Sequence, residues 1–439
     1  MAKIFIGLLI FLCLGFMPGN GNAQQVTLNS LQDALKLGFD QNPDYQNFLL
    51  NQEQAELSYK QSKSYRLPNI TGSFNGQRNV DLPTTPLPAE IFGGEPGTTI
   101  NTQFGQEYTY NAGININKQL FNRSMSLQSK LMKMSSEMVA IEKEQFQELL
   151  TQQISLYYYT ALTSQKAISI SKMDLETTLE ISSLTKDRYE QGLIDLVAYN
   201  KALISENGVK QNLLSSEQLL SDCLTELKIL MGMGLEDQLL MTEEITYELP
   251  ALLQADQLNS NLKVMNAESK MNQADLNVKI SQSALLPSLS INSYFGRQQF
   301  RDDFGLSLNS DSWSDYSYLS LNLSIPIFNG FSNRREIKKN KINYNMAQND
   351  HKEAEKTAKL EDQLLIKQYQ SGRREATLAE DNFNLTAVNE ELTYQKYEEG
   401  LISLDAYLRV FEEYLRAESA YLNSISKLYN LYSQIFPRI

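Results

Sequence analysis

The sequence predicts a mainly α-helical chain with a small β part, in which long antiparallel, coiled-coil-like helices meet at sharp hairpin tips. Two stretches, 123–191 and 331–399, contain no proline and a single glycine, and their apolar residues recur every three to four positions. Each stretch leads into a related segment, RYEQGLIDLVAY at 188–199 and KYEEGLISLDAY at 396–407. A segment repeated at an offset of 208 residues indicates that the chain consists of two similar halves.

The repeated segment predicts the tip of a helical hairpin. Gly192 and Gly400 are suited to ending a helix, because glycine adopts the left-handed conformation without a steric penalty. Asp195 and Ser403 are suited to starting the next helix, because their side chains accept a hydrogen bond from a free N–H of its first turn. Each copy of the segment therefore joins two antiparallel helices.

The N-terminus has the features of a secretory signal peptide, residues 1–23. Lys3 supplies the positive charge, and the apolar run 4–17 is too short to serve as a stable membrane anchor. Gly21 and Ala23 place small residues at the −3 and −1 positions of a cleavage site. We expect export, with cleavage after Ala23.

Composition argues against several classes of function. The formal net charge of −13 argues against nucleic acid as a partner. Cys223 is the one cysteine beyond the signal peptide, so neither an internal disulfide nor a cysteine-based metal site is expected. His351 is the one histidine, and no nucleophile–base constellation or phosphate-binding loop accompanies it. No second stretch reaches about 18 apolar residues, so we expect no transmembrane helix in the exported chain. We predict no cofactor, no metal site and no enzymatic activity.

The two halves share one order of elements. The first repeat, 24–248, is expected to contain helices 26–39 and 43–65, strands 69–78 and 107–118 around a long loop at 80–105, and a helical hairpin with its tip at 190–196 that ends at 231. The second repeat, 249–439, is expected to contain a helix at 252–285, strands 288–297 and 317–327, and a hairpin with its tip at 398–404. Leu-Pro pairs at 67–68 and 286–287 end the helix before the first strand of each repeat.

The four short strands decide the class of protein. Residues 108–117 alternate tyrosine, alanine and isoleucine with threonine, asparagine and glycine without a break. This is the length of a transmembrane β-strand, with lipid on the apolar side and water on the polar side. The alternative is a pair of ordinary hairpins on a soluble core, which leaves the polar face and the long helices without a role. Tyr108, Tyr110, Tyr316 and Tyr318 fit either an aromatic girdle at the membrane interface or ordinary β-propensity.

Four strands cannot close a barrel, and an open sheet edge is not tolerated in lipid, so closure must come from several chains. Two chains give eight strands around an interior that side chains fill, whereas three give twelve strands around an aqueous lumen. The expected fold is therefore an α-barrel of long antiparallel helices, with four transmembrane strands per chain completing a 12-stranded barrel in a homotrimer.

The order and spacing of these signals resemble the TolC-like outer membrane factors, the outer membrane efflux protein family. The resemblance rests on the duplication, the two Leu-Pro junctions, the IPIFNG junction at 325–330 and the two tips, and it covers the chain beyond the signal peptide. It implies a trimeric passive channel in outer membrane lipid that extends into the periplasm. It also implies a tripartite efflux or type I secretion system, with a periplasmic adaptor protein and an inner membrane transporter of the RND or ABC type.

Carried over to this chain, the resemblance assigns adaptor docking to the glycine and the two aliphatic residues of each tip, namely Gly192, Leu193, Ile194, Gly400, Leu401 and Ile402. Exposed apolar pairs fit a contact surface. The runner-up is a periplasmic coiled-coil structural or adaptor protein without a pore. An adaptor of that kind has one helical hairpin, whereas this sequence predicts two hairpins and two strand pairs.

The predicted periplasmic gate departs from the best-known family members, which close the pore with aspartates just beyond the second tip. Those positions fall on Ala406 and Arg409 in this chain, and Asp405 lies about 100° away around the helix. The candidate gate residues are therefore Asp195, Asp405, Ala406, Tyr407 and Arg409. A cation-selective entrance is not assumed.

Overall fold

The computed structural model describes residues 25–234, 236–245, 249, 254, 258–259 and 261–439. The expected signal peptide, residues 1–23, lies outside the described residues. The chain divides into two compact units. The helical unit comprises the described parts of residues 1–50, 143–262 and 356–439, and the sheet unit comprises residues 51–142 and 263–355. Each unit draws on both sequence repeats.

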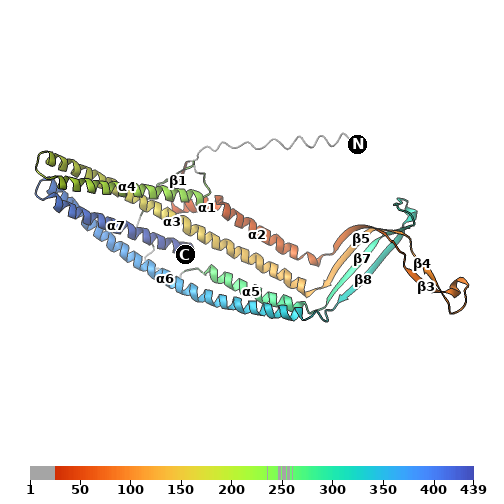
Figure 1. The fold of residues 1–439 in the computed structure, drawn as a ribbon. Coiled ribbons are helices and arrows are strands. Elements are labelled where there is room, and N and C mark those ends of the chain that lie inside the picture. The colour runs from red at the N-terminus through yellow and green to blue at the C-terminus, as the bar shows by residue number, and fades with distance from the viewer. Residues whose placement is uncertain (1–24, 235, 246–248, 250–253, 255–257, 260) are drawn as a thin grey trace, which may run out of the picture. The chain divides into compact units, whose positions relative to one another are not determined.

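The described chain is mainly helical, as the sequence predicts. Its helices are α1 (Leu31–Gln41), α2 (Pro43–Ser62), α3 (Arg123–Glu190), α4 (Leu196–Leu230), α5 (Leu262–Ser283), α6 (Ser332–Glu398) and α7 (Leu404–Ile435) (Figure 1). Short turns join α3 to α4 and α6 to α7. Within the described residues, none of the helices combines the length and the apolar character that a membrane crossing needs.

The start of the described chain differs from the expected first helix. Residues Gln25–Leu28 form strand β1, which pairs in parallel with β6 (Gln238–Met241). Helix α1 begins only at Leu31, because the Ser30 side chain accepts a hydrogen bond from the Asp33 N–H and caps the helix there. The pairing joins segments that are far apart in the sequence, so local periodicity gives no signal for it.

Three clusters of buried apolar side chains hold the helical unit together. The first packs α1 against α3 and the end of α4, and the second packs α6 against α7. The third, called the tip cluster below, joins α3, α4, α6 and α7 next to the hairpin tips. Its buried members are Ile181, Ala202, Val209, Tyr397, Leu404, Tyr407, Leu408, Phe411 and Tyr414. Large aromatic rings bury much apolar area at low entropic cost, so this cluster is a strong contact between the two hairpins.

The sheet unit contains a four-stranded antiparallel sheet in the order β2-β5-β7-β8. Its strands are β2 (Asn69–Arg78), β5 (Tyr108–Phe121), β7 (Ser288–Arg301) and β8 (Ser314–Ser324) (Figure 1). The two sequence repeats meet where β5 pairs with β7. Strands β2 and β8 are the edges of the sheet, and each has one neighbouring strand among the described residues.

Strand β8 ends at Ser324, earlier than the expected end at 327. Ile325 and Ile327 continue the apolar alternation but lie outside the strand, and they are 55% and 95% exposed. Pro326 has no N–H to donate to a ladder, which accounts for the early end. Strand β7 runs to Arg301, beyond the expected end at 297, because it pairs with β5 over that length.

The region 80–105, expected as an irregular loop, contains a small second sheet. Strands β3 (Thr84–Pro88) and β4 (Thr99–Gln103) pair in antiparallel fashion around a 3₁₀ turn at Ala89–Phe92. Figure 1 shows this hairpin beyond the end of the four-stranded sheet. Prolines are tolerated in it, because both strands of a two-stranded pair are edges.

Gly113 and Gly296 pair across β5 and β7 where there is no space for a side chain. A Cβ atom added to Gly296 would lie 2.5 Å from the Ala112 carbonyl oxygen and 2.7 Å from the Tyr294 hydroxyl. One added to Gly113 would lie 2.7 Å from the Phe295 carbonyl oxygen. The ring of Tyr294 covers both glycines and replaces the side-chain contacts that they lack.

We expect Gly296→Val to destabilise the folded protein by about 3 kcal/mol, because a clash with backbone atoms cannot be relieved by a change of rotamer. Gly72→Val is the matched control, since Gly72 lies in β2 of the same sheet and nothing lies within 4 Å of the position of its added Cβ. Thermal unfolding of the detergent-purified protein, followed by circular dichroism, measures both. Equal melting temperatures for the two variants would contradict the close approach.

Candidate functional site

The two hairpin tips have the same backbone geometry. The φ angle is +73° at Gly192 and +77° at Gly400, in the left-handed region that glycine adopts without strain. In the first tip, the Gly192 N–H donates to the Tyr189 carbonyl and the Leu193 N–H to the Arg188 carbonyl, both at 2.9 Å. The second tip repeats this pattern at 3.0 and 2.9 Å. This Schellman arrangement satisfies carbonyls at the ends of α3 and α6.

Side-chain caps start the helices that leave the tips. Asp195 Oδ1 accepts a hydrogen bond from the Ala198 N–H at 2.8 Å. Ser403 Oγ accepts one from the Ala406 N–H at 3.3 Å. Of these candidate gate residues, Asp195 is exposed and acts as the N-cap of α4. Ala406 is half-buried and supplies the N–H that binds the Ser403 side chain.

The aliphatic residues of the tips are accessible. Leu193 and Leu401 are each 68% exposed. Ile194 and Ile402 are half-buried, and Ile402 packs against the tip cluster. Each tip therefore presents one large apolar side chain to its surroundings and uses the next one partly for its own packing.

Equivalent tyrosines have opposite environments in the two tips. In the first tip, Tyr189 and Tyr199 stack with ring centroids 5.6 Å apart, and Tyr189 is 37% exposed. In the second tip, Tyr397 and Tyr407 also stack at 5.6 Å, but they are only 1% and 0% exposed. The duplicated sequence therefore forms one tip with an accessible aromatic pair and one whose pair is buried between the hairpins.

Polar contacts join the first hairpin to the second near the tips. Lys201 Nζ lies 2.8 Å from Asp405 Oδ1. The Arg188 guanidinium lies 4.7 Å from the centre of the Tyr397 ring and donates to the carbonyls of Tyr397 and Glu398 at 3.2 and 3.3 Å. The cation therefore binds both a ring face and two carbonyls of the opposite hairpin.

Two tyrosine–carboxylate pairs lie near the tips, one between the hairpins and one within the second hairpin. The Tyr394 hydroxyl donates to Glu180 Oε2 at 2.7 Å, and the Tyr407 hydroxyl donates to Glu390 Oε1 at 2.6 Å. Burial raises the pKa of both tyrosines, and the neighbouring carboxylates raise it further. Burial also raises the pKa of Glu390, although the hydrogen bond from Tyr407 opposes that shift.

The structure gives different surroundings to the three candidate gate residues beyond the second tip. Asp405 is exposed and pairs with Lys201. Arg409 is exposed, and its Nε donates to the Asp405 carbonyl at 3.2 Å. Tyr407 is completely buried in the tip cluster. The polar residues that cross between hairpins include Lys201 and Arg188, which sequence reasoning missed because their partners are about 200 positions away.

The sheet has two faces of different chemistry, since neighbouring residues in a strand point to opposite sides. Paired residues assign the aliphatic side chains to one face, which includes Ile70, Phe74, Ile114, Ile116, Phe295, Leu319, Leu321 and Leu323. The other face is polar, and there the Asn115 side chain donates to Ser73 Oγ at 2.8 Å. In the four strands, all within the described chain, every lysine, arginine and aspartate lies on the aliphatic side by register.

The strand-end tyrosines divide between the two faces. Tyr108 and Tyr110 lie on the aliphatic face, whereas Tyr316 and Tyr318 pair with Gly296 and Tyr294 on the polar face. Tyr294 and Tyr318 stack at 6.0 Å. A girdle on the lipid side therefore fits only the first pair of tyrosines, and the second pair covers the polar face.

Charged pairs bound the aliphatic band at the loop end of the sheet. Arg78 Nε lies 2.6 Å from Glu107 Oε1, and Arg297 Nε lies 2.8 Å from Asp315 Oδ1. Exposed charges next to an aliphatic band mark the level at which an apolar surrounding would end.

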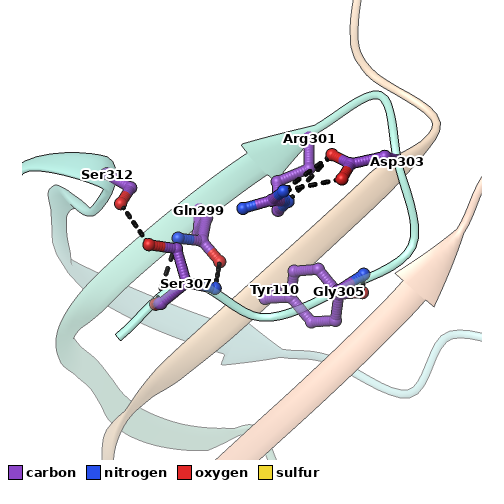
Figure 2. A network of polar contacts seen from close by, with 7 residues as sticks. All are labelled: Tyr110, Gln299, Arg301, Asp303, Gly305, Ser307 and Ser312. Atoms are coloured by element: carbon purple, nitrogen blue, oxygen red, sulfur yellow. Dashed lines mark hydrogen bonds and ion pairs between the residues drawn. The ribbon is translucent and has the colours of Figure 1, made fainter. Parts of the chain in front are cut away.

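The loop between β7 and β8 is tied to the sheet by Gln299, which is completely buried. As Figure 2 shows, its Nε2 donates to the Ser307 carbonyl at 3.3 Å and its Oε1 accepts from the Ser307 N–H at 3.1 Å. The Tyr110 hydroxyl accepts a hydrogen bond from the Gly305 N–H at 3.4 Å. The amide of Gln299 thus pairs with the loop backbone as a further strand would and fixes the loop at this end of the sheet.

Within the described residues, no group of three or more His, Cys, Asp or Glu side chains is arranged to hold a metal ion. The candidate functional surfaces are two separate ones: the two tips with the contacts that join them, in the helical unit, and the sheet with one aliphatic and one uncharged polar face, in the sheet unit.

Comparison with known proteins identifies the family. Residues 34–233 and 253–431 match the outer membrane efflux proteins. The chain belongs to the outer membrane efflux protein family. Membership places this chain in the outer membrane, extending into the periplasm. It also favours a channel component over the periplasmic structural or adaptor protein that the sequence left as runner-up.

The chain is similar in sequence to the probable efflux pump outer membrane protein TtgC of Pseudomonas putida. The two are 23% identical over 323 residues, which cover 71% of this chain and 62% of TtgC, less than two thirds of that relative. Its structure is similar to the CmeC outer membrane channel of Campylobacter jejuni, with a TM-score of 0.75, 17% identity, and coverage of 93% of this chain and 84% of that one. A membrane protein from Pseudomonas aeruginosa gives a TM-score of 0.76 at 15% identity, with 93% and 92% covered. These likenesses confirm the predicted fold class.

Proposed function

We propose that three copies of this chain form a passive channel, the exit duct of a tripartite efflux or type I secretion system across the periplasm and outer membrane. The observation that carries the proposal is a sheet with two unpaired edges and an exposed aliphatic face. Leu319, Leu321 and Leu323 on that face are 73%, 65% and 61% exposed. Lipid around such a face requires paired edges, and pairing β8 of one copy with β2 of the next closes twelve strands around a lumen.

The uncharged polar face then lines the barrel, where its side chains form hydrogen bonds with water but carry no charge. Proteins of this family are efflux channel components and are non-enzymatic in general. The duct therefore supplies no energy, and transport depends on a homotrimer in outer membrane lipid together with a periplasmic adaptor and an inner membrane RND or ABC transporter.

The hairpin tips form the periplasmic end of this duct, where they bind the adaptor and hold the entrance closed. The adaptor binds Gly192, Leu193 and Ile194 of one tip and the equivalent residues 400–402 of the other. The exposed leucines support this assignment, because exposed large apolar residues at a sharp turn favour a protein contact. Contacts between the hairpins, led by Lys201 with Asp405, keep the entrance closed.

The channel itself is tested by extraction from outer membranes with detergent. We expect a heat-resistant trimer that conducts ions in planar lipid bilayers, because edge pairing between copies is needed to close the barrel. The measurements are electrophoresis without and with boiling, and single-channel recording. Release of the protein as a monomer by osmotic shock would refute the proposal.

The gate is tested by exchanging the charges of one contact. Lys201→Asp places like charges opposite each other and should raise the open fraction of channels up to about fivefold per pair, since an exposed ion pair contributes about 0.2–1 kcal/mol. The double variant Lys201→Asp with Asp405→Lys restores the attraction and should return the open fraction to the wild-type value. Single-channel recording in planar bilayers measures both variants. An open fraction in the double variant equal to that of Lys201→Asp would count against a gating contact.

The docking surface is tested by charging the exposed leucines. Leu193→Glu combined with Leu401→Glu should abolish co-purification of the adaptor, because a carboxylate in an apolar contact loses its hydration without gaining a partner. Heat-resistant trimers should remain in the outer membrane. Gln191→Glu combined with Gln395→Glu is the matched control, since it adds the same charges at exposed positions close by. Undiminished co-purification with the leucine variants would exclude docking through these residues.

A further inference from the structure

Two buried carboxyls lie against each other between the hairpins, away from the tip residues. Asp174 on α3 and Glu418 on α7 are each 6% exposed, and each carboxyl influences the pKa of the other. The Tyr414 hydroxyl donates to Asp174 Oδ1 at 2.9 Å. Two ionised carboxylates have no hydrogen to share, so the contact requires a proton on one of them.

The groups that face the pair are carboxyls, hydroxyls and amides. Tyr407 and Tyr414 approach from α7, Glu390 from α6, and the Thr178 hydroxyl binds the Asp174 carbonyl on α3. Burial is the main cause that raises the pKa of both carboxyls, and the charge of Asp174 adds to the effect at Glu418, whose pKa rises to about 8. The hydrogen bond from Tyr414 opposes the shift at Asp174.

A polar cavity reaches Glu418 from between α3, α4 and α7. Its volume is ≈ 260 Å³. Most of its lining residues are serine, threonine or asparagine, including Ser171 on α3 and Asn212 and Ser215 on α4. A polar cavity of this size can hold water, so a proton has a route between the carboxyl pair and solvent.

A row of aromatic rings connects the carboxyl pair to the second tip. Successive ring centroids are 6.0 Å apart from Tyr414 to Phe411, 5.9 Å to Tyr407 and 5.6 Å to Tyr397. The Arg188 guanidinium of the first hairpin lies on the last ring. The row lies on α7 and α6 and ends at a contact with α3, so it extends from the carboxyl pair to a contact between the two hairpins.

We propose that the Asp174–Glu418 pair is a pH-sensitive switch that holds the two hairpins together while the pair keeps its shared proton and releases them when that proton is lost. The proposal rests on the hairpin gate proposed above. The proton passes to water in the cavity and leaves two like charges in buried contact, which is relieved when α3 and α7 separate and water enters. The pKa of Glu418 is raised from its ordinary value of 4.5, so the contact stabilises the closed arrangement at low pH and is lost as the pH rises through about 8.

The test is single-channel recording of the full-length trimer in planar bilayers between pH 6 and 9.5. We expect the open fraction of the wild-type channel to rise at least fivefold through about pH 8. Glu418→Gln mimics the protonated carboxyl and should keep the open fraction at its low-pH value throughout. Glu412→Gln removes an exposed carboxyl of the same helix and should leave the wild-type profile unchanged. A rise in Glu418→Gln equal to that of the wild type would overturn the proposal.

Hydrogen exchange of the wild-type trimer provides a measurement that needs no variant and no conductance. After correction for the intrinsic rate, amides of 170–181 and 411–421 should lose at least fivefold protection between pH 7 and 9. Unchanged protection in both segments would also overturn the switch. A trimer that does not conduct at any pH refutes the channel, whereas the exchange result still decides the switch.

Discussion

The unpaired edges of β2 and β8 are the constraint on which the rest of the structure depends. A four-stranded sheet with an exposed aliphatic face has backbone donors and acceptors along both edges, and lipid offers them no partner. Association of copies satisfies those groups without adding strands to the chain. The close approach at Gly113 and Gly296, covered by Tyr294, brings the strands of the two repeats together. The edges of the sheet therefore require association of copies, and its centre joins the two repeats within one chain.

The helical unit shows how one duplicated sequence serves two purposes. Both tips end a long helix with the same glycine geometry and the same pair of stacked tyrosines. Only the second pair is buried, because the first hairpin covers it with Arg188. Burial of the rings at Tyr397 and Tyr407 favours association of the hairpins, while the first pair at Tyr189 and Tyr199 stays accessible for other contacts. The difference lies in packing and not in the repeated residues.

Buried carboxyls between the hairpins point to a conformational role. A carboxyl pair in a low-dielectric contact costs stability unless it is protonated or hydrogen-bonded, and an apolar pair of similar size would serve packing better. Asp174 and Glu418 meet this cost with a shared proton. Within the second hairpin, the half-buried Glu390 accepts a hydrogen bond from the Tyr407 hydroxyl. Groups of this kind link packing to proton concentration, which apolar residues cannot do. Because Asp174 and Glu418 lie on different hairpins, a change in their protonation acts on the contact between the hairpins.

The sequence by itself determined the elements whose signals are local. Glycine and N-cap residues predicted both tips, periodicity predicted the long helices, and alternation predicted the strands and their two faces. Local rules were wrong where pairing overrode them, as in β1 with β6 and in the β3–β4 hairpin. Alternation also placed the end of the last strand too late, because Pro326 has no N–H to donate to the ladder.

Only the tertiary structure decided which side chains meet. The partners of Lys201, Arg188 and Asp174 lie more than 200 residues away, so no periodicity could pair them. Tyr407 is a candidate gate residue from its place beyond the tip, and only the packing of the helices shows that its ring is buried. Spacing fixes the face of a helix on which a residue lies, but packing decides what covers that face.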